Sequence, residues 1–118
     1  MTERESKKIT VRFWSSEKGN QPVLELIRYL SRSDKIKVGD DLKTVELGWP
    51  IGMPVCRPMG NGLNEVRTTL SNNRELRILF FVQEQEAVLL HAFFKKTQQT
   101  PKQDLALARA RMRECKVR

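Results

Sequence analysis

The hydrophobic pattern changes from alternating to helical within the first half of the chain. Residues 9–14 (Ile-Thr-Val-Arg-Phe-Trp) alternate apolar and polar types, which predicts a strand. Pro22, a favourable residue in a first helical turn, begins a segment with apolar residues at helical spacing up to Leu30. A second helix is predicted from Ser33 or Asp34, and its inner face would comprise Val38, Leu42, Val45 and Trp49.

Residues 48–62 break both patterns with glycine and proline. These residues are Gly48, Pro50, Gly52, Pro54, Pro58, Gly60 and Gly62. Proline has no backbone N–H to donate and glycine disfavours regular elements, so a continuous helix or a central strand is excluded. The segment is too short and too apolar for a domain linker, and we predict an ordered loop that crosses one edge of the domain.

The second half of the chain carries three strand patterns and one helix. The strand patterns are residues 63–70, 75–82 and 87–94. The helix has a clear start, because Thr100 suits an N-cap, Pro101 the first position and Gln103 a capping box. Its apolar stripe would comprise Leu105, Ala108 and Met112. The predicted order β-α-α-β-β-β-α describes one small α+β domain over residues 1–118, with an antiparallel sheet, two N-terminal helices and one C-terminal helix.

The length of the turn between the first two of these three strands decides which side chains share a face. A two-residue loop at Asn72-Asn73 would place Arg67 on the face of the apolar residues. A three-residue loop at residues 71–73 pairs Arg67 with Arg77 instead. It collects on the other face Val66, Thr68, Leu70, Leu76, Ile78, Phe80 and Val82. Because a one-residue slip turns every side chain over, we prefer the register that collects the apolar set.

In the preferred register Arg67 and Arg77 are direct cross-strand neighbours. Like charges at such positions repel each other, so the pair requires a compensating acid, such as Glu65, or a site that binds an anion. Two solvated arginines beside Glu65 are the alternative interpretation.

The third strand extends the same surface. By alternation His91, Phe93 and Lys95 point to one side of the sheet. The residues expected on the other side are Leu90, Ala92 and Phe94. If the first set shares the face of the arginines, a cluster of cations forms there, with Phe93 or Phe81 to stack on a base. His91 is then either a hydrogen-bonded structural residue or an acid–base catalyst.

The net charge of the chain indicates what kind of partner the protein binds. The 118 residues carry a formal net charge of +8, and 39% of them are hydrophobic, as in a soluble globular domain. From Lys95 onward there are eight basic and two acidic residues, so this segment holds +6 of the +8. The excess indicates a polyanionic or strongly acidic partner, unless it is only the solvated face of a basic helix.

The sequence also provides no sign of a membrane protein, a secreted protein or a metalloprotein. No apolar stretch is long enough for a membrane span, and the polar N-terminus lacks the apolar core of a secretory signal, so we expect a cytoplasmic protein. Cys56 and Cys115 form no CxxC pair, and we expect both to be ordinary reduced thiols. With a single His and no phosphate-binding loop, we expect neither a metal site nor a cofactor.

Three segments of the C-terminal half resemble a known family. They are residues 62–67 (GLNEVR), 77–81 (RILFF) and 89–97 (LLHAFFKKT), followed by Pro101. Together they resemble the phage-derived HigB-like branch of the RelE/ParE toxin superfamily. The N-terminal strand, the helix pair and the Gly/Pro-rich loop also come in the order typical of that branch. The resemblance covers nearly the whole chain and implies a RelE-like fold.

The resemblance implies the toxin of a type II toxin–antitoxin system, an endoribonuclease that cleaves mRNA, commonly on the ribosome. In such enzymes the RNA 2′-hydroxyl attacks the adjacent phosphate without a metal and leaves a cyclic phosphate and a free 5′-hydroxyl. Cationic side chains hold the phosphate and stabilise the charge of the transition state. The expected catalytic residues are Arg67, Arg77, Lys95 and His91, and the expected RNA-binding residues are Lys96, Phe93, Thr97, Arg109 and Arg113.

The last helix departs from that family. Many relatives carry a Tyr near the C-terminus that acts as base or stacks on the substrate, whereas residues 101–118 contain neither Tyr nor His. The general base is therefore open between His91 and a Lys with a lowered pKa.

Two other functions stay open. One is a ParE-like toxin that inhibits gyrase, which would not need the cation cluster, and the other is a non-catalytic RNA- or ribosome-binding module. The resemblance also implies a cognate antitoxin, often a helix-turn-helix DNA-binding protein. Such a partner should be acidic where it covers the basic face.

Overall fold

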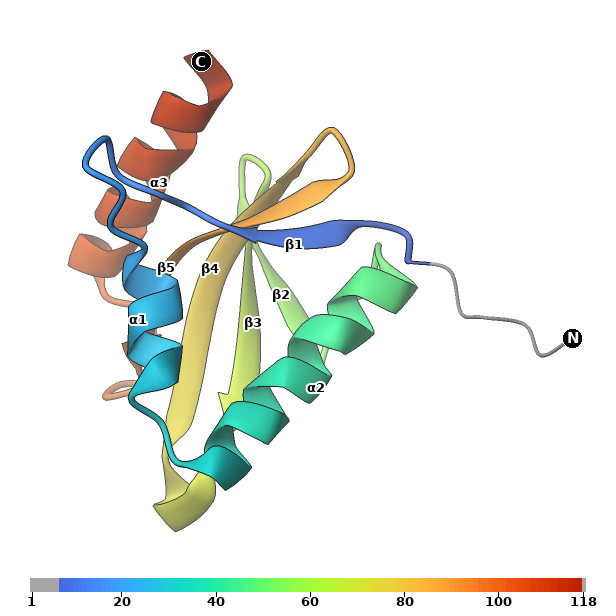
Figure 1. Cartoon of the computed structure of the whole chain (residues 1–118), viewed down its shortest axis with the longest axis vertical. Coiled ribbons are helices and arrows are strands. Elements are labelled where there is room, and N and C mark those ends of the chain that lie inside the picture. Colours follow the sequence, from blue (N-terminus) through green and yellow to red (C-terminus); the bar gives the residue numbers. More distant parts are fainter. Residues whose placement is uncertain (1–6, 118) are drawn as a thin grey trace, which may run out of the picture.

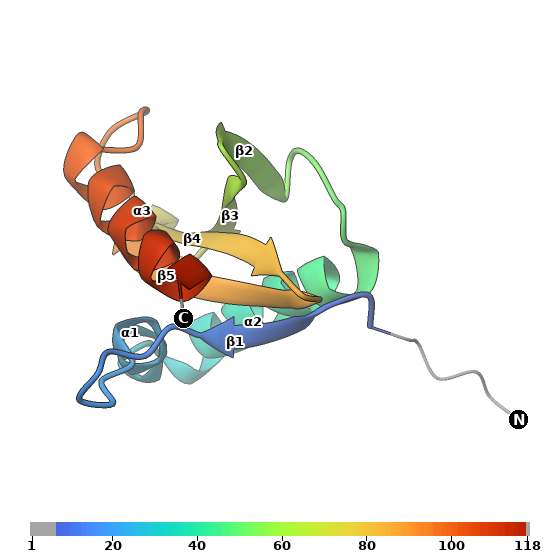
Figure 2. The ribbon, with the colours of Figure 1, turned by 90° about the horizontal axis from the view of Figure 1, so that it is seen from above.

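The computed structural model describes residues 7–117, in which one five-stranded sheet carries helices on both faces (Figure 1, Figure 2). The strands are β1 (Thr10–Phe13), β2 (Cys56–Gly60), β3 (Leu63–Thr69), β4 (Glu75–Gln83) and β5 (Glu86–Phe94). The helices are α1 (Pro22–Arg28), α2 (Arg32–Gly48) and α3 (Lys102–Val117), and a 3₁₀ turn spans Ser71–Asn73. The small α+β domain is therefore confirmed.

Two features of the sheet correct the predicted architecture. The strand order is β1-β5-β4-β3-β2, and β1 runs parallel to β5, so the sheet is mixed rather than antiparallel. Two helices and three strands separate β1 from β5 along the chain. So long a connection allows two strands to pair in parallel, whereas a hairpin allows only an antiparallel pair. The second correction is β2, which forms inside the predicted loop and makes the element order differ from the expected RelE-like one. β2 is an edge strand, where Pro58 is tolerated because only one side of the strand must bond to the sheet.

The register of β3 against β4 is the one that the three-residue turn predicts. Arg67 lies opposite Arg77, and Val66 lies opposite Ile78. In the turn, Asn72 and Asn73 adopt left-handed conformations with φ of 60° and 58°. Asparagine tolerates this conformation better than most residues, which explains the turn chemically.

Each face of the sheet has its own core, and Figure 2 shows the sheet between the two helical layers. The core on the α1 and α2 side contains most of the predicted apolar residues: Val38, Val45, Val66, Leu70, Leu76, Ile78 and Phe80. The core beneath α3 contains Leu63, Leu79, Phe81, Ala108 and Met112. The inner faces predicted for the second and third helices are therefore confirmed.

A bulge changes the direction of one side chain in β5. The register against β4 shifts between Leu79 and Phe80, and Leu90 is the extra residue of β5 at that point. Leu90 consequently packs in the core beneath α3, whereas simple alternation predicted the opposite face. Beyond the bulge His91 lies opposite Leu79, on the α3 face.

A buried carboxylate joins the start of α2 to the β3–β4 turn. Asp34 accepts hydrogen bonds from the backbone N–H and the hydroxyl of Ser71, each at 3.0 Å, and from Arg74 Nη2 at 2.9 Å. The Ser71 N–H, supported by its hydroxyl and by the charge of Arg74, holds the pKa of Asp34 below its ordinary value despite burial. The ionised carboxylate therefore fixes the turn that sets the register.

We predict that Asp34→Asn destabilises the protein at neutral pH, because an amide cannot accept all three hydrogen bonds that the carboxylate accepts. A carboxyl whose pKa falls on folding contributes stability above its unfolded pKa, ordinarily 3.8, and loses that contribution as the pH falls further. The urea midpoints of wild type and variant should therefore differ most near neutral pH and converge below about pH 4. Asp40→Asn, at an exposed position of the same helix, serves as the control. Equal midpoints for wild type and Asp34→Asn at neutral pH would contradict this role.

Candidate functional site

The α3 face of the sheet carries two rows of polar and aromatic side chains that cross the strands. The first row runs from Arg57 in β2 through Glu65 in β3 and Leu79 in β4 to His91 in β5. The second row comprises Arg67, Arg77 and Phe93. The start of α3 and residues 95–101 lie over these rows. The pairing of the strands thus brings most of the predicted catalytic residues to one surface.

A fully buried acid of the first row bonds to an arginine of the second. Glu65 Oε1 accepts from Arg67 Nε at 3.1 Å, and Glu65 Oε2 accepts from the hydroxyl of Thr100 at 2.7 Å. The hydroxyl of Thr100 is therefore donated to Glu65 rather than acting as the predicted N-cap, and α3 begins at Lys102. The compensating role expected for Glu65 is confirmed. Its bond to Thr100 could not be foreseen, because 35 residues separate the two in sequence.

Arg77 is held in a similar way by a second acid. Its Nε donates to Glu75 Oε1 at 2.9 Å, and its Nη1 donates to the carbonyl of Gln98 at 3.4 Å. The two arginine side chains differ in access, since 22% of Arg67 is exposed but only 2% of Arg77. Both guanidiniums are thus oriented through Nε, and within residues 7–117 the two terminal nitrogens of Arg67 stay available. Of the cross-strand pair, Arg67 is the one that an external anion can reach.

His91 is oriented by an acid that the sequence did not single out. Its Nε2 lies 2.5 Å from Asp104 Oδ1, in the first turn of α3. Because a carboxylate only accepts, Nε2 carries the hydrogen and Nδ1 is the free ring nitrogen. The imidazole also stacks on Phe93, with ring centroids 5.8 Å apart and an interplanar angle of 22°. A strand residue and a helix residue meet here, so no fixed sequence spacing could have signalled the pair.

The predicted lysines lie at the border of this surface. Lys95, Lys96 and Thr97 are exposed, and within residues 7–117 neither lysine has an ion pair. Thr97 donates its hydroxyl to the carbonyl of Gln99 at 2.7 Å. A cavity of about 420 Å³ adjoins the segment and is lined by Phe93, Phe94, Lys96, Pro101, Gln103 and Asp104. In this cavity Lys96 and Phe93 lie beside Asp104, the residue that bonds to His91.

Of the other residues that were expected to bind RNA, one is bonded within the protein and one is exposed. Arg109 donates to the carbonyl of Met59 at 2.9 Å and to that of Gly60 at 3.3 Å, so it joins α3 to the edge strand β2. Arg113 is exposed one turn later. Phe81, considered as a stacking residue, is buried in the core beneath α3 and has no surface to offer.

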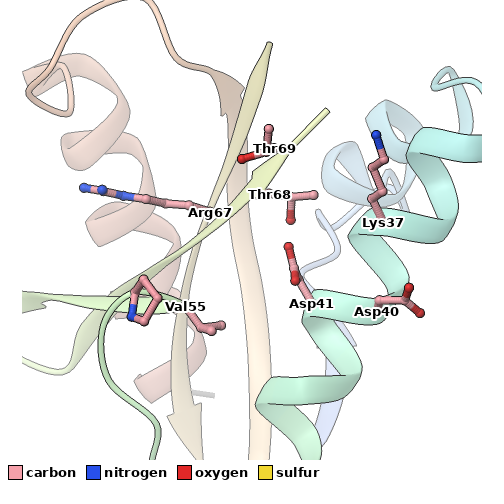
Figure 3. Close-up of a pocket in the computed structure, with 8 residues that line it drawn as sticks. Lys37, Asp40, Asp41, Val55, Arg67, Thr68 and Thr69 are labelled. Carbon is pink, nitrogen blue, oxygen red and sulfur yellow. The ribbon is translucent and has the colours of Figure 1, made fainter. Parts of the chain in front are cut away.

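A second cavity, of about 400 Å³, lies between α2 and the end of β3 (Figure 3). It is lined by Lys37, Asp40, Asp41, Pro54, Val55, Arg67, Thr68 and Thr69. In Figure 3 the two aspartates lie on α2, whereas Arg67 extends to the other side, toward α3. Paired acids repel phosphate, so this cavity suits an anion less well than the α3 face does.

Cysteine and metal chemistry receive no support from the described residues. Cys56 and Cys115 are free and buried, and burial raises the pKa of the Cys56 thiol to about 11. Residues 7–117 contain no group of three His, Cys, Asp or Glu side chains that could hold a metal ion. In the same range no helix is both long and apolar enough to cross a membrane.

We predict that Arg109→Ala lowers the free energy of unfolding by about 1–2 kcal/mol, because two backbone carbonyls of β2 lose a charged donor. Arg113→Ala, on the same helix, should change it by less than about 0.5 kcal/mol, as is usual for an exposed side chain. Chemical denaturation of both variants gives the comparison. An Arg109 variant as stable as wild type would show that this side chain is free for an external ligand.

The comparison with family models places the chain among known proteins. The model described as phage-derived protein Gp49-like (DUF891) matches residues 25–113, from within α1 to near the end of α3. No curated protein was found to match the chain. Gp49-like proteins are associated with the toxins of toxin–antitoxin systems. Since the match covers most of the length and includes both polar rows, the chain belongs to the phage-derived Gp49-like family.

Proposed function

We propose that the protein is a toxin of the HigB-like kind that cleaves mRNA by attack of the RNA 2′-hydroxyl on the adjacent phosphate. The observation that carries this proposal is the placement of the His91–Asp104 pair beside the Arg67–Arg77 pair on one sheet face. An acid–base group and fixed cations are the two components that this reaction requires. The family membership supports a toxin role.

In the proposed mechanism His91 is the general base. Asp104 binds Nε2 and leaves Nδ1 to accept the proton of the 2′-hydroxyl. The oxygen then bonds to phosphorus, the bond to the 5′-oxygen breaks, and that oxygen takes up a proton from water, while His91 returns the proton that it accepted to the solvent. The products are a 2′,3′-cyclic phosphate and a 5′-hydroxyl. Asp104 orients the imidazole, so this pair replaces the tyrosine that residues 101–118 lack.

Arg67 stabilises the additional negative charge on phosphorus. Glu65 binds only its Nε, so the terminal nitrogens can donate to a phosphate oxygen. Because Glu65 is buried and also bonded to Thr100, the guanidinium is held before the substrate arrives. Arg77 is buried opposite Arg67 in the neighbouring strand, and its bond to the Gln98 carbonyl holds the segment that covers the site.

The exposed residues around the site would bind the rest of the RNA. Phe93 is half-buried and offers an aromatic face for a base, while Lys95 and Lys96 bind phosphates. Thr97 directly follows Lys96, and Arg113 is exposed on α3. The expected substrate is mRNA on the ribosome, and the expected inhibitor is an antitoxin, often a helix-turn-helix protein, with acidic residues that cover these cations.

We predict that His91→Gln lowers the rate constant for cleavage by about 10²–10⁴-fold, the usual contribution of a general base. Arg67→Ala should lower it by about 10²-fold through loss of charge stabilisation. The measurement is single-turnover cleavage of a synthetic RNA by the purified chain, alone and with translating ribosomes, with the cyclic phosphate identified by mass spectrometry. A substrate with one 2′-deoxy nucleotide should resist cleavage at that position.

Lys43→Ala, an exposed cation on α2, is the control variant and should cleave at the wild-type rate. Melting temperatures of all variants separate loss of chemistry from loss of fold. If the wild-type chain arrests bacterial growth while mRNA stays intact, the ribonuclease proposal is wrong. Gyrase inhibition is then the function to test.

A further inference from the structure

A third cavity lies on the other side of Thr100 from the Lys96 cavity, between β2 and the start of α3. Its volume is about 320 Å³, and it is lined by Arg57, Met59, Gln99, Thr100, Lys102 and Leu105. Arg57 occupies the first polar row, directly opposite Glu65. The cavity therefore borders the candidate site on the side of the edge strand.

Two cations in this cavity have no acidic partner in the described part of the chain. Arg57 faces Glu65 across the strands, but both oxygens of Glu65 are already bonded to Arg67 and Thr100. Lys102 is exposed at the first residue of α3. The unpaired N–H groups of a helix start add to the attraction for an anion there. Two unpaired cations beside a helix start thus favour a phosphate group.

The other walls of the cavity suit a nucleobase. Met59 and Leu105 are half-buried and pack against the core beneath α3, so they present apolar surface. Gln99 adds an amide that can both donate and accept. Arg109 holds the carbonyls of Met59 and Gly60, which fixes β2 as a rigid wall. The apolar walls, the amide and the cations together match a base joined to a phosphate.

We propose that this cavity binds one nucleotide of single-stranded RNA, with its phosphate on Arg57 and Lys102 and its base between Met59 and Leu105. The inference rests on the proposed function, because it takes the substrate to be RNA. β2 and β5 are three strand spacings apart, about 14 Å, so RNA that reaches both this cavity and the Lys96 cavity crosses the whole candidate site. The cavity then contributes to binding of the substrate rather than to the chemical step.

The test measures binding without cleavage. A fluorescent RNA oligonucleotide with 2′-deoxy sugars throughout its central segment cannot be cleaved there, and its dissociation constant is measured by anisotropy at several salt concentrations. We expect Arg57→Ala/Lys102→Ala to weaken binding tenfold or more and to reduce the salt slope by about 0.7, because the variant loses one phosphate contact and each such contact on a single strand contributes about 0.7. The matched control is Lys35→Ala/Lys43→Ala, which removes the same charge from exposed positions of α2 and should leave affinity and slope unchanged.

The outcomes separate this inference from the proposed function. Equal binding by wild type and Arg57→Ala/Lys102→Ala, with unchanged melting temperatures, would overturn the nucleotide site even if the chain cleaves RNA. Binding that depends on the two cations, without cleavage of the all-ribose oligonucleotide, would support the site and contradict the nuclease. If the wild type binds polyglutamate through these residues but no RNA, the inference is wrong and the cavity belongs to an acidic protein segment.

Discussion

The register of β3 against β4 is the constraint on which the rest of the molecule depends. A slip of one residue would turn the apolar face of β3 away from α1 and α2 and would direct Arg67 into that core. Two features hold the register in place: the left-handed asparagines of the turn, and the buried Asp34, which bonds to Ser71 beside them. A carboxylate at the start of α2 thus determines which surface the arginines occupy.

The same register places two like charges opposite each other, and the structure offsets them with one buried and one half-buried acid. Arg67 and Arg77 face each other, and each is bonded through Nε to a glutamate two residues earlier in its own strand. Burying such pairs costs desolvation energy, and this cost is offset only when all bonding groups are satisfied. Thr100 adds a hydrogen bond to Glu65 and the Gln98 carbonyl accepts one from Arg77, so the segment that follows β5 becomes part of the site. Stability and preorganisation of the guanidiniums therefore depend on the same contacts.

The sequence predicts those parts of the fold that follow from local periodicity. The inner faces of the helices and the pairing of Arg67 with Arg77 follow from where apolar residues recur. The site contacts do not, because they join a strand to a distant segment: His91 to Asp104, and Glu65 to Thr100. The direction of Leu90 was wrong because a bulge adds a residue, which leaves no signal in an alternating pattern. The edge strand β2 was missed because Pro58 and Gly60 disfavour a strand locally, whereas pairing with β3 overrides that preference.

Part of the positive charge of the C-terminal segment has a structural role, which the net charge of the segment does not reveal. Arg109 and Arg111 donate to backbone carbonyls, and Arg111 stacks on Trp14 with its guanidinium carbon 4.3 Å from the ring centroid. Burial lowers the pKa of Arg111, as expected for a side chain that serves packing. The cations left for an external anion gather instead around the end of β5 and the start of α3: Lys95, Lys96 and Lys102, with Arg57 across the cavity. A basic helix would spread positive charge along its whole length, whereas this arrangement concentrates the unpaired cations near Arg67 and His91, the two residues to which the proposed function gives the chemistry.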